Sequence, residues 1–408
     1  MVVKTGDHGC MELGSGLFNL SGMSSPVAIV DQVISEAIRV TASDILLEPE
    51  EKEVRVRLRV DGVLQTYGTM AHGAYDQVLS RIKVLGNMDV TENRKPQESK
   101  IRVEVEGHPY VLRAGIVTTN FGQMAALRVL DLPQYTQFTQ LGVSEALASK
   151  IRSNISGRYG LFLVCGPTGS GKTTTVHACL KHLNTGEVNI MTIEDPVEYV
   201  MPGVNQIEVG EDVGLDFVRG LRQILRLNPD IVFVGEIRDA ETAKIAVQAS
   251  LTGHLVISTI HGRNSVGAIY RLLDLGIDRF MINYALRAVV SQRLMRRICE
   301  HCREDYRATP EELALYAQET GKKPLQLLTG RGCEMCHQSR FRGRVGIYEM
   351  LEMDEETRQL IFSGADEEVF KKELLRKGFK TMNEEGIRLV DEGVTSIPEF
   401  IRTMYDAR

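Results

Sequence analysis

The stretch GLFLVCGPTGSGKTTTVHACLKHL, residues 160–183, decides the fold of most of this chain. Residues 160–165 are apolar, residues 166–173 are rich in glycine, and residues 172–183 have helical spacing. A strand that runs through Gly-x-x-x-x-Gly-Lys-Thr into a helix is the phosphate-binding loop pattern. The residues that we expect to contact phosphates are Gly166, Pro167, Thr168, Gly169, Ser170, Gly171, Lys172, Thr173 and Thr174.

Each part of this loop has a chemical purpose. Glycines let backbone N–H groups turn toward phosphate oxygens, and the helix that follows presents the positive end of its dipole to the same anion. Lys172 places a positive charge on the β- and γ-phosphates, and the Thr173 hydroxyl is a ligand for Mg²⁺. A structural glycine turn would not explain a lysine at its apex. The sequence therefore predicts binding of ATP with Mg²⁺.

Hydrolysis also needs a carboxylate that polarises water, and two acids are candidates. Glu236 ends the apolar run 231–236, so it should lie at the carboxyl end of a strand, where α/β sheets bind ligands. Glu194 belongs to the acidic segment TIEDPVE, 192–198, which follows another short apolar run. A solvated acidic cluster is the alternative for that segment. We expect Glu236 to orient the attacking water, with Glu194 as the second candidate.

Two histidines flank a third predicted strand. His254 precedes and His261 follows the apolar residues 255–260. A single histidine is more often a structural residue, but these two lie near the other site segments in the chain. We include both as candidate sensors of a γ-phosphate.

The N-terminal part of the chain has a different pattern. Residues 1–25 are rich in Gly and Ser and are expected to form a loosely ordered tail. A helix is predicted from Pro26 to about residue 40. Strict alternation over 54–60 predicts a strand with apolar residues on one face and three arginines on the other, followed by a turn at Asp61-Gly62. The arginines would face solvent or a neighbouring subunit.

From about residue 143, strands and helices alternate in the rhythm of an α/β domain with a largely parallel sheet. The segment before it, DLPQYTQFTQLG, has little pattern and is expected to be a linker. The predicted organisation is a tail at 1–25, an α+β domain at 26–130, a linker at 131–142 and an ATPase domain at 143–408, the last containing a cysteine region at 299–336 and a mainly helical part at 337–408.

Composition excludes several classes of protein. The 408 residues include 43% apolar and 25% charged side chains, which is typical of a globular protein. No apolar run approaches the roughly 18 residues of a membrane-spanning helix, and the first residues lack a signal-peptide pattern, so we expect a cytoplasmic protein. The net charge of −6 and the lack of aromatic residues interleaved with the basic run at 287–303 argue against nucleic acid as a partner. A ring-shaped nucleic-acid translocase stays as an alternative because basic residues recur at Arg287, Arg293, Arg296, Arg297 and Arg303.

Four of the seven cysteines form two Cys-x-x-Cys pairs, Cys299 with Cys302 and Cys333 with Cys336. Four thiolates can surround a tetrahedral Zn²⁺ and leave no open position, so the predicted metal is structural. His301 or His337 could replace one cysteine, and the spacing does not decide between them.

The chain resembles the secretion-superfamily ATPases, the GspE/PilB-like motors of type II secretion and type IV pilus assembly. The resemblance runs from about Ser43 to near the C-terminus. GPTGSGKTTT at 166–175 resembles the Walker A motif, TIEDPVEY at 192–199 the Asp box, PDIVFVGEIRDAET at 229–242 Walker B, and LTGHLVISTIH at 251–261 the His box. ASDILLEP at 42–49 and LRVDG at 58–62 are similar to the signature of the N-terminal domain, with Leu46 where the family usually has histidine.

The resemblance implies a RecA-like P-loop domain preceded by a smaller α+β (PAS-like) domain, and a homo-hexamer that acts on an inner-membrane platform protein. It implies that Arg113 and Arg128 stabilise charge on the γ-phosphate. The four cysteines match assembly-type members rather than retraction motors. A competence-type pseudopilus ATPase and a zinc-stabilised scaffold that binds ATP without hydrolysing it are further alternatives.

Overall fold

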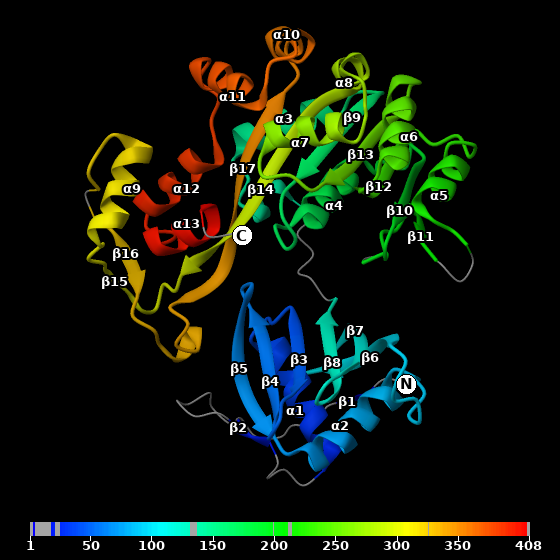
Figure 1. Ribbon diagram of the computed structural model, residues 1–408, viewed down its shortest axis with the longest axis vertical. Coiled ribbons are helices and arrows are strands. Elements are labelled where there is room, and N and C mark those ends of the chain that lie inside the picture. Colours follow the sequence, from blue (N-terminus) through cyan, green and yellow to red (C-terminus); the bar gives the residue numbers. More distant parts are fainter. Residues whose placement is uncertain are drawn as a thin grey trace. The chain divides into compact units, whose positions relative to one another are not determined.

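The computed structural model describes residues 3–4, 18–20, 25–130, 137–198, 200–210, 214–324 and 326–405. Most of the predicted tail and residues 131–136 of the predicted linker lie outside this range. The chain divides into two compact units, 1–133 and 134–408. Figure 1 shows both units, and each is described here by itself.

The described part of unit 1 is an eight-stranded sheet with two helices. The strand order is β1-β6-β7-β8-β3-β4-β5-β2. The strands are β1 (Val3–Lys4), β2 (Phe18–Asn19), β3 (Asp44–Pro49), β4 (Val54–Val60), β5 (Val63–Met70), β6 (Gln97–Val105), β7 (His108–Thr119) and β8 (Gly122–Val129), and the helices are α1 (Pro26–Arg39) and α2 (His72–Leu85).

Unit 1 has its own hydrophobic core, formed by the apolar stripes of α1 and α2 and one face of the sheet. The predicted helix from Pro26 is confirmed, and Ser25 caps it by accepting a hydrogen bond from the Ala28 N–H. The alternation over 54–60 is also confirmed, because Val54, Val56 and Leu58 are buried in this core. Alternation works here because only one face of the sheet is covered.

The three arginines of β4 lie on the other face and are paired within the unit. Arg57 binds Glu48 on β3 at 2.5 Å, and Arg59 lies 3.2 Å from Asp44. Arg55 pairs with Glu50 at 2.9 Å. These cross-strand ion pairs explain how three like charges are tolerated on one strand.

Unit 2 is built on a seven-stranded sheet in its described residues, with the order β11-β10-β12-β13-β9-β14-β17. Its main strands are β9 (Gly160–Cys165), β10 (Ile190–Glu194), β11 (Asn205–Glu208), β12 (Ile231–Ile237), β13 (Leu255–Ile260), β14 (Leu286–Ile298) and β17 (Phe341–Glu352). A separate pair is formed by β15 (Arg303–Asp305) and β16 (Leu328–Gly330).

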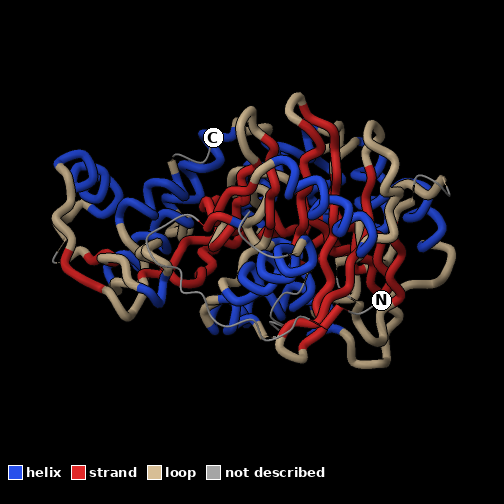
Figure 2. The backbone as a smooth tube through the Cα atoms, turned by 90° about the horizontal axis from the view of Figure 1, so that it is seen from below, coloured by secondary structure: helices blue, strands red, loops and turns tan. Residues whose placement is uncertain are grey.

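Helices cover this sheet on both sides (Figures 1 and 2). The α-helices of unit 2 are α3 (Glu145–Ile155), α4 (Lys172–Leu183), α5 (Phe217–Ile224), α6 (Ala240–Leu251), α7 (Ser265–Asp274), α8 (Arg279–Ala285), α9 (Pro310–Thr320), α10 (Glu355–Ser363), α11 (Glu367–Arg376), α12 (Met382–Asp391) and α13 (Ile397–Met404), with short 3₁₀ turns at Phe138–Leu141 and Glu334–Cys336.

The central strand β9 explains this layering. All six of its residues are buried, and successive side chains enter different cores. Leu161 and Leu163 join one hydrophobic cluster, whereas Phe162 and Val164 join the cluster on the opposite face. A continuous apolar strand is what a parallel sheet covered on both faces requires. Phe138, within the segment predicted as a linker, also packs into the second of these clusters.

One large feature of unit 2 was not predicted. β14 and β17 pair antiparallel over most of their length and form a long hairpin, with the cysteine region between them. The sequence-based reading treated 337–408 as mainly helical and did not separate β17 from the helices α10 to α13. Helices α12 and α13 pack against this hairpin and α9 packs against these two helices, within one hydrophobic cluster that includes Met295, Ile347 and Phe400.

Candidate nucleotide site

Four predicted segments meet at one edge of the unit 2 sheet. The neighbouring strands β9, β13, β12 and β10 are parallel, so their carboxyl ends lie side by side. Cys165, which precedes the glycine-rich loop, is paired in register with Ile260, which precedes His261. Glu236 lies near the end of the next strand and Glu194 ends the one after it. This is the edge at which open α/β sheets bind ligands.

The glycine-rich loop has the backbone geometry that its sequence predicts. Gly166 has a φ of +152°, and a Cβ built there would lie 2.5 Å from the Gln292 carbonyl oxygen and 2.6 Å from Ser170 Oγ. Gly171 has a φ of +87°, a left-handed conformation that favours glycine, immediately before α4 begins at Lys172. The loop therefore turns tightly and directs the amino end of α4 toward the same point.

Lys172 is available for an anion. Its Nζ donates to the carbonyl oxygens of Gly166 at 2.9 Å and Pro167 at 3.0 Å, and among the described residues it forms no ion pair. Burial lowers the pKa of Lys172 from its ordinary value. A partly buried ammonium without a carboxylate partner fits a phosphate, which would supply the missing charge. Thr173 and Thr174 follow in the first turn of α4, so the loop residues suit a nucleotide and its Mg²⁺.

Gln292 on β14 supports the loop, and the sequence gave no signal for it. Its side chain is buried, and Nε2 donates to the Ser170 carbonyl oxygen at 2.7 Å. Its backbone oxygen also faces Gly166. Only the pairing of β14 with β9 brings these residues together.

Glu194 lies in a buried, hydrogen-bonded setting. It accepts from Thr192 Oγ1 at 2.6 Å and from Gln206 Nε2 at 3.0 Å, and His177 Nε2 of α4 lies 3.8 Å away. Burial by itself would raise the pKa of Glu194, but these neighbours outweigh it and hold the pKa below its ordinary value. Glu194 is therefore an ionised acid beside the helix that carries Lys172. His177 was not identified from the sequence.

Glu236 is displaced out of regular strand geometry. The register of β12 shifts between Val234 and Ile237, which is a bulge, and the Thr259 hydroxyl donates to the Gly235 carbonyl oxygen at 2.7 Å. Bulges next to active sites redirect side chains. Here Glu236 contacts the Arg238 guanidinium, and its Oε2 lies 3.3 Å from His261 Nε2.

The two histidines have different positions. His261 is half exposed, and burial together with the positive charges of Lys172 and Arg238 lowers its pKa. His254 precedes β13, and its carbonyl oxygen accepts from the N–H of Gly160 at the start of β9. Six residues of strand span roughly 20 Å, so His254 lies at the opposite edge of the sheet from the loop. The structure brings His261, but not His254, to the candidate site.

Arg113 and Arg128 belong to unit 1, where they are cross-strand neighbours on β7 and β8. Arg113 pairs with Glu98 at 2.7 Å and Arg128 with Asp44 at 2.9 Å. Both side chains are more than a third exposed, so both guanidinium groups are accessible on the uncovered face of the sheet.

The four cysteines converge. Their Sγ atoms all lie within 4.8 Å of one another. Cys299 Sγ and Cys333 Sγ are 3.8 Å apart, as are Cys302 Sγ and Cys336 Sγ. Bonds of about 2.3 Å to a tetrahedral metal imply S···S separations of about 3.8 Å, whereas a disulfide requires about 2 Å. The cluster therefore fits a metal ion with four thiolate ligands, without a histidine.

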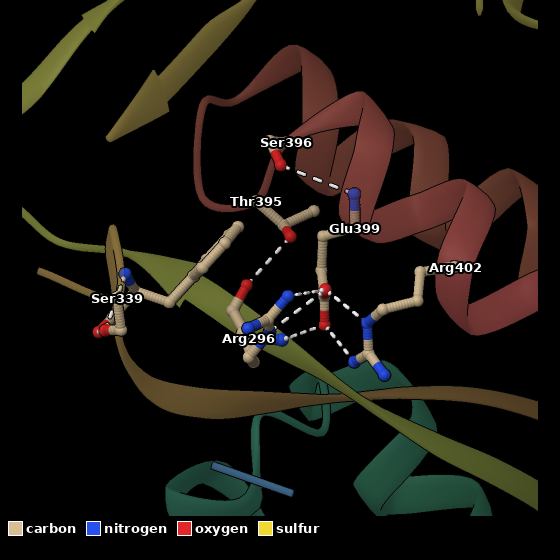
Figure 3. A network of polar contacts seen from close by, with 7 residues as sticks. Arg296, Ser339, Thr395, Ser396, Glu399 and Arg402 are labelled. Carbon is tan, nitrogen blue, oxygen red and sulfur yellow. Dashed lines mark hydrogen bonds and ion pairs between the residues drawn. The ribbon is translucent and has the colours of Figure 1, made fainter. Parts of the chain in front are cut away.

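The basic residues of β14 make contacts inside unit 2. Figure 3 shows Glu399 of α13 between Arg296 and Arg402. Arg296 Nη2 lies 2.7 Å from Glu399, and Arg296 also stacks on the Phe341 ring at 4.1 Å. Arg293 is half-buried and donates to the Thr403 carbonyl oxygen. These interactions use Arg293 and Arg296, two of the five basic residues that supported the nucleic-acid alternative.

A model of the family described as "Type II/IV secretion system protein" matches residues 20–402. The chain belongs to this family of secretion ATPases. The type IV pilus assembly ATPase PilB of Thermus thermophilus is 42% identical over 93% of this chain, and the type II secretion system protein E of Pseudomonas aeruginosa is 42% identical over 92%. The matched regions are 43% and 75% of those two proteins.

The fold is shared with ATPases of known structure. The pilus retraction motor PilT, solved with bound ADP, aligns with a TM-score of 0.61 at 28% identity, covering 91% of this chain and 95% of that one. The resemblance inferred from the sequence motifs is thereby confirmed, as is the assignment to an ATPase class. In the described residues, no helix has the length and apolar character needed to span a membrane.

Proposed function

We propose that this secretion ATPase hydrolyses ATP with Mg²⁺ at the edge of the unit 2 sheet and works as a homo-hexameric motor. The observation that carries the proposal is the arrangement of Lys172, Glu236 and His261: Lys172 on the loop has no ion pair among the described residues, and Glu236, two strands from β9, contacts His261. Lys172 fits the binding of an ATP phosphate, and the Glu236–His261 contact fits hydrolysis.

The steps assigned to the chain's own residues are few. Lys172 exchanges its two carbonyl contacts for phosphate oxygens, and the N–H groups of residues 169–173 bind the same anion. Thr173 and Glu194 would hold the Mg²⁺, which neutralises charge on the transferred group. Glu236 accepts a hydrogen bond from the attacking water, with His261 orienting its carboxylate. Glu194 is the second candidate for this base.

Residues outside the sheet edge complete the proposal. Arg113 and Arg128 would stabilise charge on the γ-phosphate, so that ATP, but not ADP, favours one arrangement of the two units.

His254 stays a candidate sensor only if another contact connects it to the site. Unit 1 is proposed to be a PAS-like α+β domain that precedes a RecA-like ATPase domain.

The metal at the four cysteines is proposed to be structural Zn²⁺. Zinc prefers tetrahedral thiolate sites, and a site with four protein ligands has no open position for chemistry. The site lies at the connected end of the β14–β17 hairpin, where the Cys299 N–H donates to the Arg340 carbonyl oxygen at 3.0 Å.

The names of the relatives support the proposed biological role. Their names and the cysteine pairs support powering type IV pilus assembly or type II secretion rather than retraction, through an inner-membrane platform protein that would hold the motor at the cytoplasmic side. A competence-type pseudopilus system is the alternative.

The test is Glu236→Gln, with Glu352→Gln as the matched control, because Glu352 pairs with Lys150 on the surface and belongs to none of the site segments. We expect at least about 100-fold slower phosphate release for Glu236→Gln, with ATP affinity retained, and wild-type rates for the control. Turnover equal to that of the wild type would reject Glu236 as the base. ATP binding without any hydrolysis by the wild-type hexamer would favour the scaffold alternative.

A further inference from the structure

A row of buried polar side chains crosses the sheet beneath the phosphate-binding loop. Cys165 on β9 is paired in register with Ser291 on β14, and Ser291 is paired with Glu349 on β17. Directly opposite residues on neighbouring strands point to the same face, so the three side chains lie in a line. All three are buried, and Cys165 is the residue immediately before the loop.

Glu349 connects two helices from this row. Its Oε1 accepts from the Ser265 N–H at 2.7 Å and from the Ser265 hydroxyl at 2.8 Å, and its Oε2 accepts from the Met382 N–H at 3.1 Å. Ser265 is the first residue of α7 and Met382 the first residue of α12. The carboxylate is therefore placed at the positive ends of two helix dipoles. Among the described residues it has no ion-pair partner within 4 Å.

A very short segment connects Ser265, which binds Glu349, to His261 of the candidate site. Only residues 262–264 separate His261 from Ser265. The same segment is held from its other side, because Cys165 Sγ donates to the Asn264 carbonyl oxygen at 3.3 Å. Any movement of His261 must therefore be accommodated within three residues or passed to α7 and Glu349.

We propose that Glu349 is a positioning residue for ATP hydrolysis: it fixes segment 262–264 so that His261 meets Glu236, and it couples that segment to α12. This inference rests on the proposed function. α12 packs against β17 and α13, so the nucleotide edge and the C-terminal helices share one buried carboxylate. No other residue described in the structure bonds to the first N–H of both helices.

The chemistry requires an acid at this position. A carboxylate has two acceptor oxygens for three donors, whereas a glutamine would present an NH₂ group toward at least one N–H or hydroxyl. Two donors facing each other in a buried site would displace one of the helix ends. Because displacements of about 1 Å can cost up to about 100-fold in rate, even a small shift of segment 262–264 should be measurable in turnover.

The test compares Glu349→Gln with Glu352→Gln in the full-length assembled protein. Glu352 lies on the same strand and pairs with Lys150 on the surface, so it is a matched control. We expect kcat for ATP to fall about 10-fold in Glu349→Gln while KM for ATP changes less than 2-fold, measured well below both melting temperatures. Glu352→Gln should retain the wild-type values.

A milder variant covers the case in which Glu349→Gln does not fold. Ser265→Ala removes one of the three hydrogen bonds and keeps the backbone bond, and we expect kcat to fall about 3-fold with KM unchanged. Wild-type kcat in the folded variants, or a rise in KM that matches the fall in kcat, would overturn the inference. A wild-type protein without ATPase activity would instead reject the proposed function.

Discussion

At the scale of single residues, Lys172 shows most directly how the sequence specifies the site. Its position after Gly171 predicted a role with phosphate, and the structure gives it two carbonyl contacts and no ion pair in the described residues. Glu236 and His261 were chosen separately, from strand ends, and the structure pairs them. Gln292, His177 and Glu349 were not predicted, because their partners are distant in sequence.

Lys172→Ala should abolish nucleotide binding or hydrolysis without unfolding the protein. The reason is that, within the part of the chain that the structure describes, Nζ makes two hydrogen bonds, both to carbonyls, so its removal should change the melting temperature by no more than about 2 °C. ATP binding and phosphate release are the measurements, and Lys181→Ala, an exposed position on the same helix, is the control. A Lys172→Ala protein with normal turnover would show that phosphate binds elsewhere.

At the scale of secondary structure elements, the β14–β17 hairpin organises the C-terminal part of unit 2. It completes the sheet beside β9, supports the phosphate-binding loop through Gln292, and carries the cysteine cluster in the segment that connects its two strands. Helix α13 is attached to it by the buried carboxylate of Glu399 (Figure 3). The hairpin thus connects elements that the sequence-based reading had treated as separate.

Glu399→Gln should destabilise unit 2 in a pH-dependent way. Burial alone would raise the pKa of Glu399, but bonds from Arg402 and Arg296 outweigh it and hold the pKa below its ordinary value of 4.5. A depressed folded-state pKa means that its stabilisation is complete above pH 4.5 and disappears as the pH falls through the lower, folded-state pKa. The free energy of unfolding should decrease by roughly 3 kcal/mol at pH 7.

Denaturant unfolding at pH 7 and near pH 4 measures this difference. Glu385→Gln is the control, since Glu385 pairs with Arg388 near the surface and its loss should cost at most about 1 kcal/mol. A difference between wild type and Glu399→Gln that grew as the pH fell would contradict the assignment of the charged form to the folded state.

The cysteine cluster gives a second prediction at this scale. Purified protein should contain about one zinc per chain, and Cys333→Ser should lose most of it and lower the melting temperature, because metal binding contributes to folding. Metal analysis and thermal unfolding are the measurements. Cys179→Ala, a buried cysteine of α4 outside the cluster, should keep its metal. Equal zinc in both variants would exclude the four-cysteine site.

At the scale of the whole molecule, the chain consists of two units with separate hydrophobic cores. The described residues of unit 1 expose arginines on the uncovered face of their sheet, and unit 2 holds the nucleotide edge. The proposed function assigns charges from both units to the γ-phosphate, so that bound ATP could bias the arrangement of the units.

Arg128→Ala tests whether unit 1 contributes a charge to ATP hydrolysis. We expect roughly 10³-fold slower ATP hydrolysis with ATP binding retained, because the charge would act only on the transferred phosphoryl group. Arg102→Ala, an exposed change on β6 of the same unit, should have little effect on steady-state phosphate release. Similar rates for the two variants would remove unit 1 from the chemistry.

The sequence by itself determined the ATPase class, the loop, the strands that carry Glu194 and Glu236, and the group of four cysteines. These features are local: a loop pattern, an apolar run or a Cys-x-x-Cys spacing depends on residues close together in the chain. Only the tertiary structure decided which strand ends are neighbours, and so separated His261 from His254. It also revealed the β14–β17 hairpin and the contacts of Gln292 and Glu349, because these join residues far apart in the chain: Glu349 and Ser265 are 84 positions apart, and Gln292 and Ser170 are 122 apart.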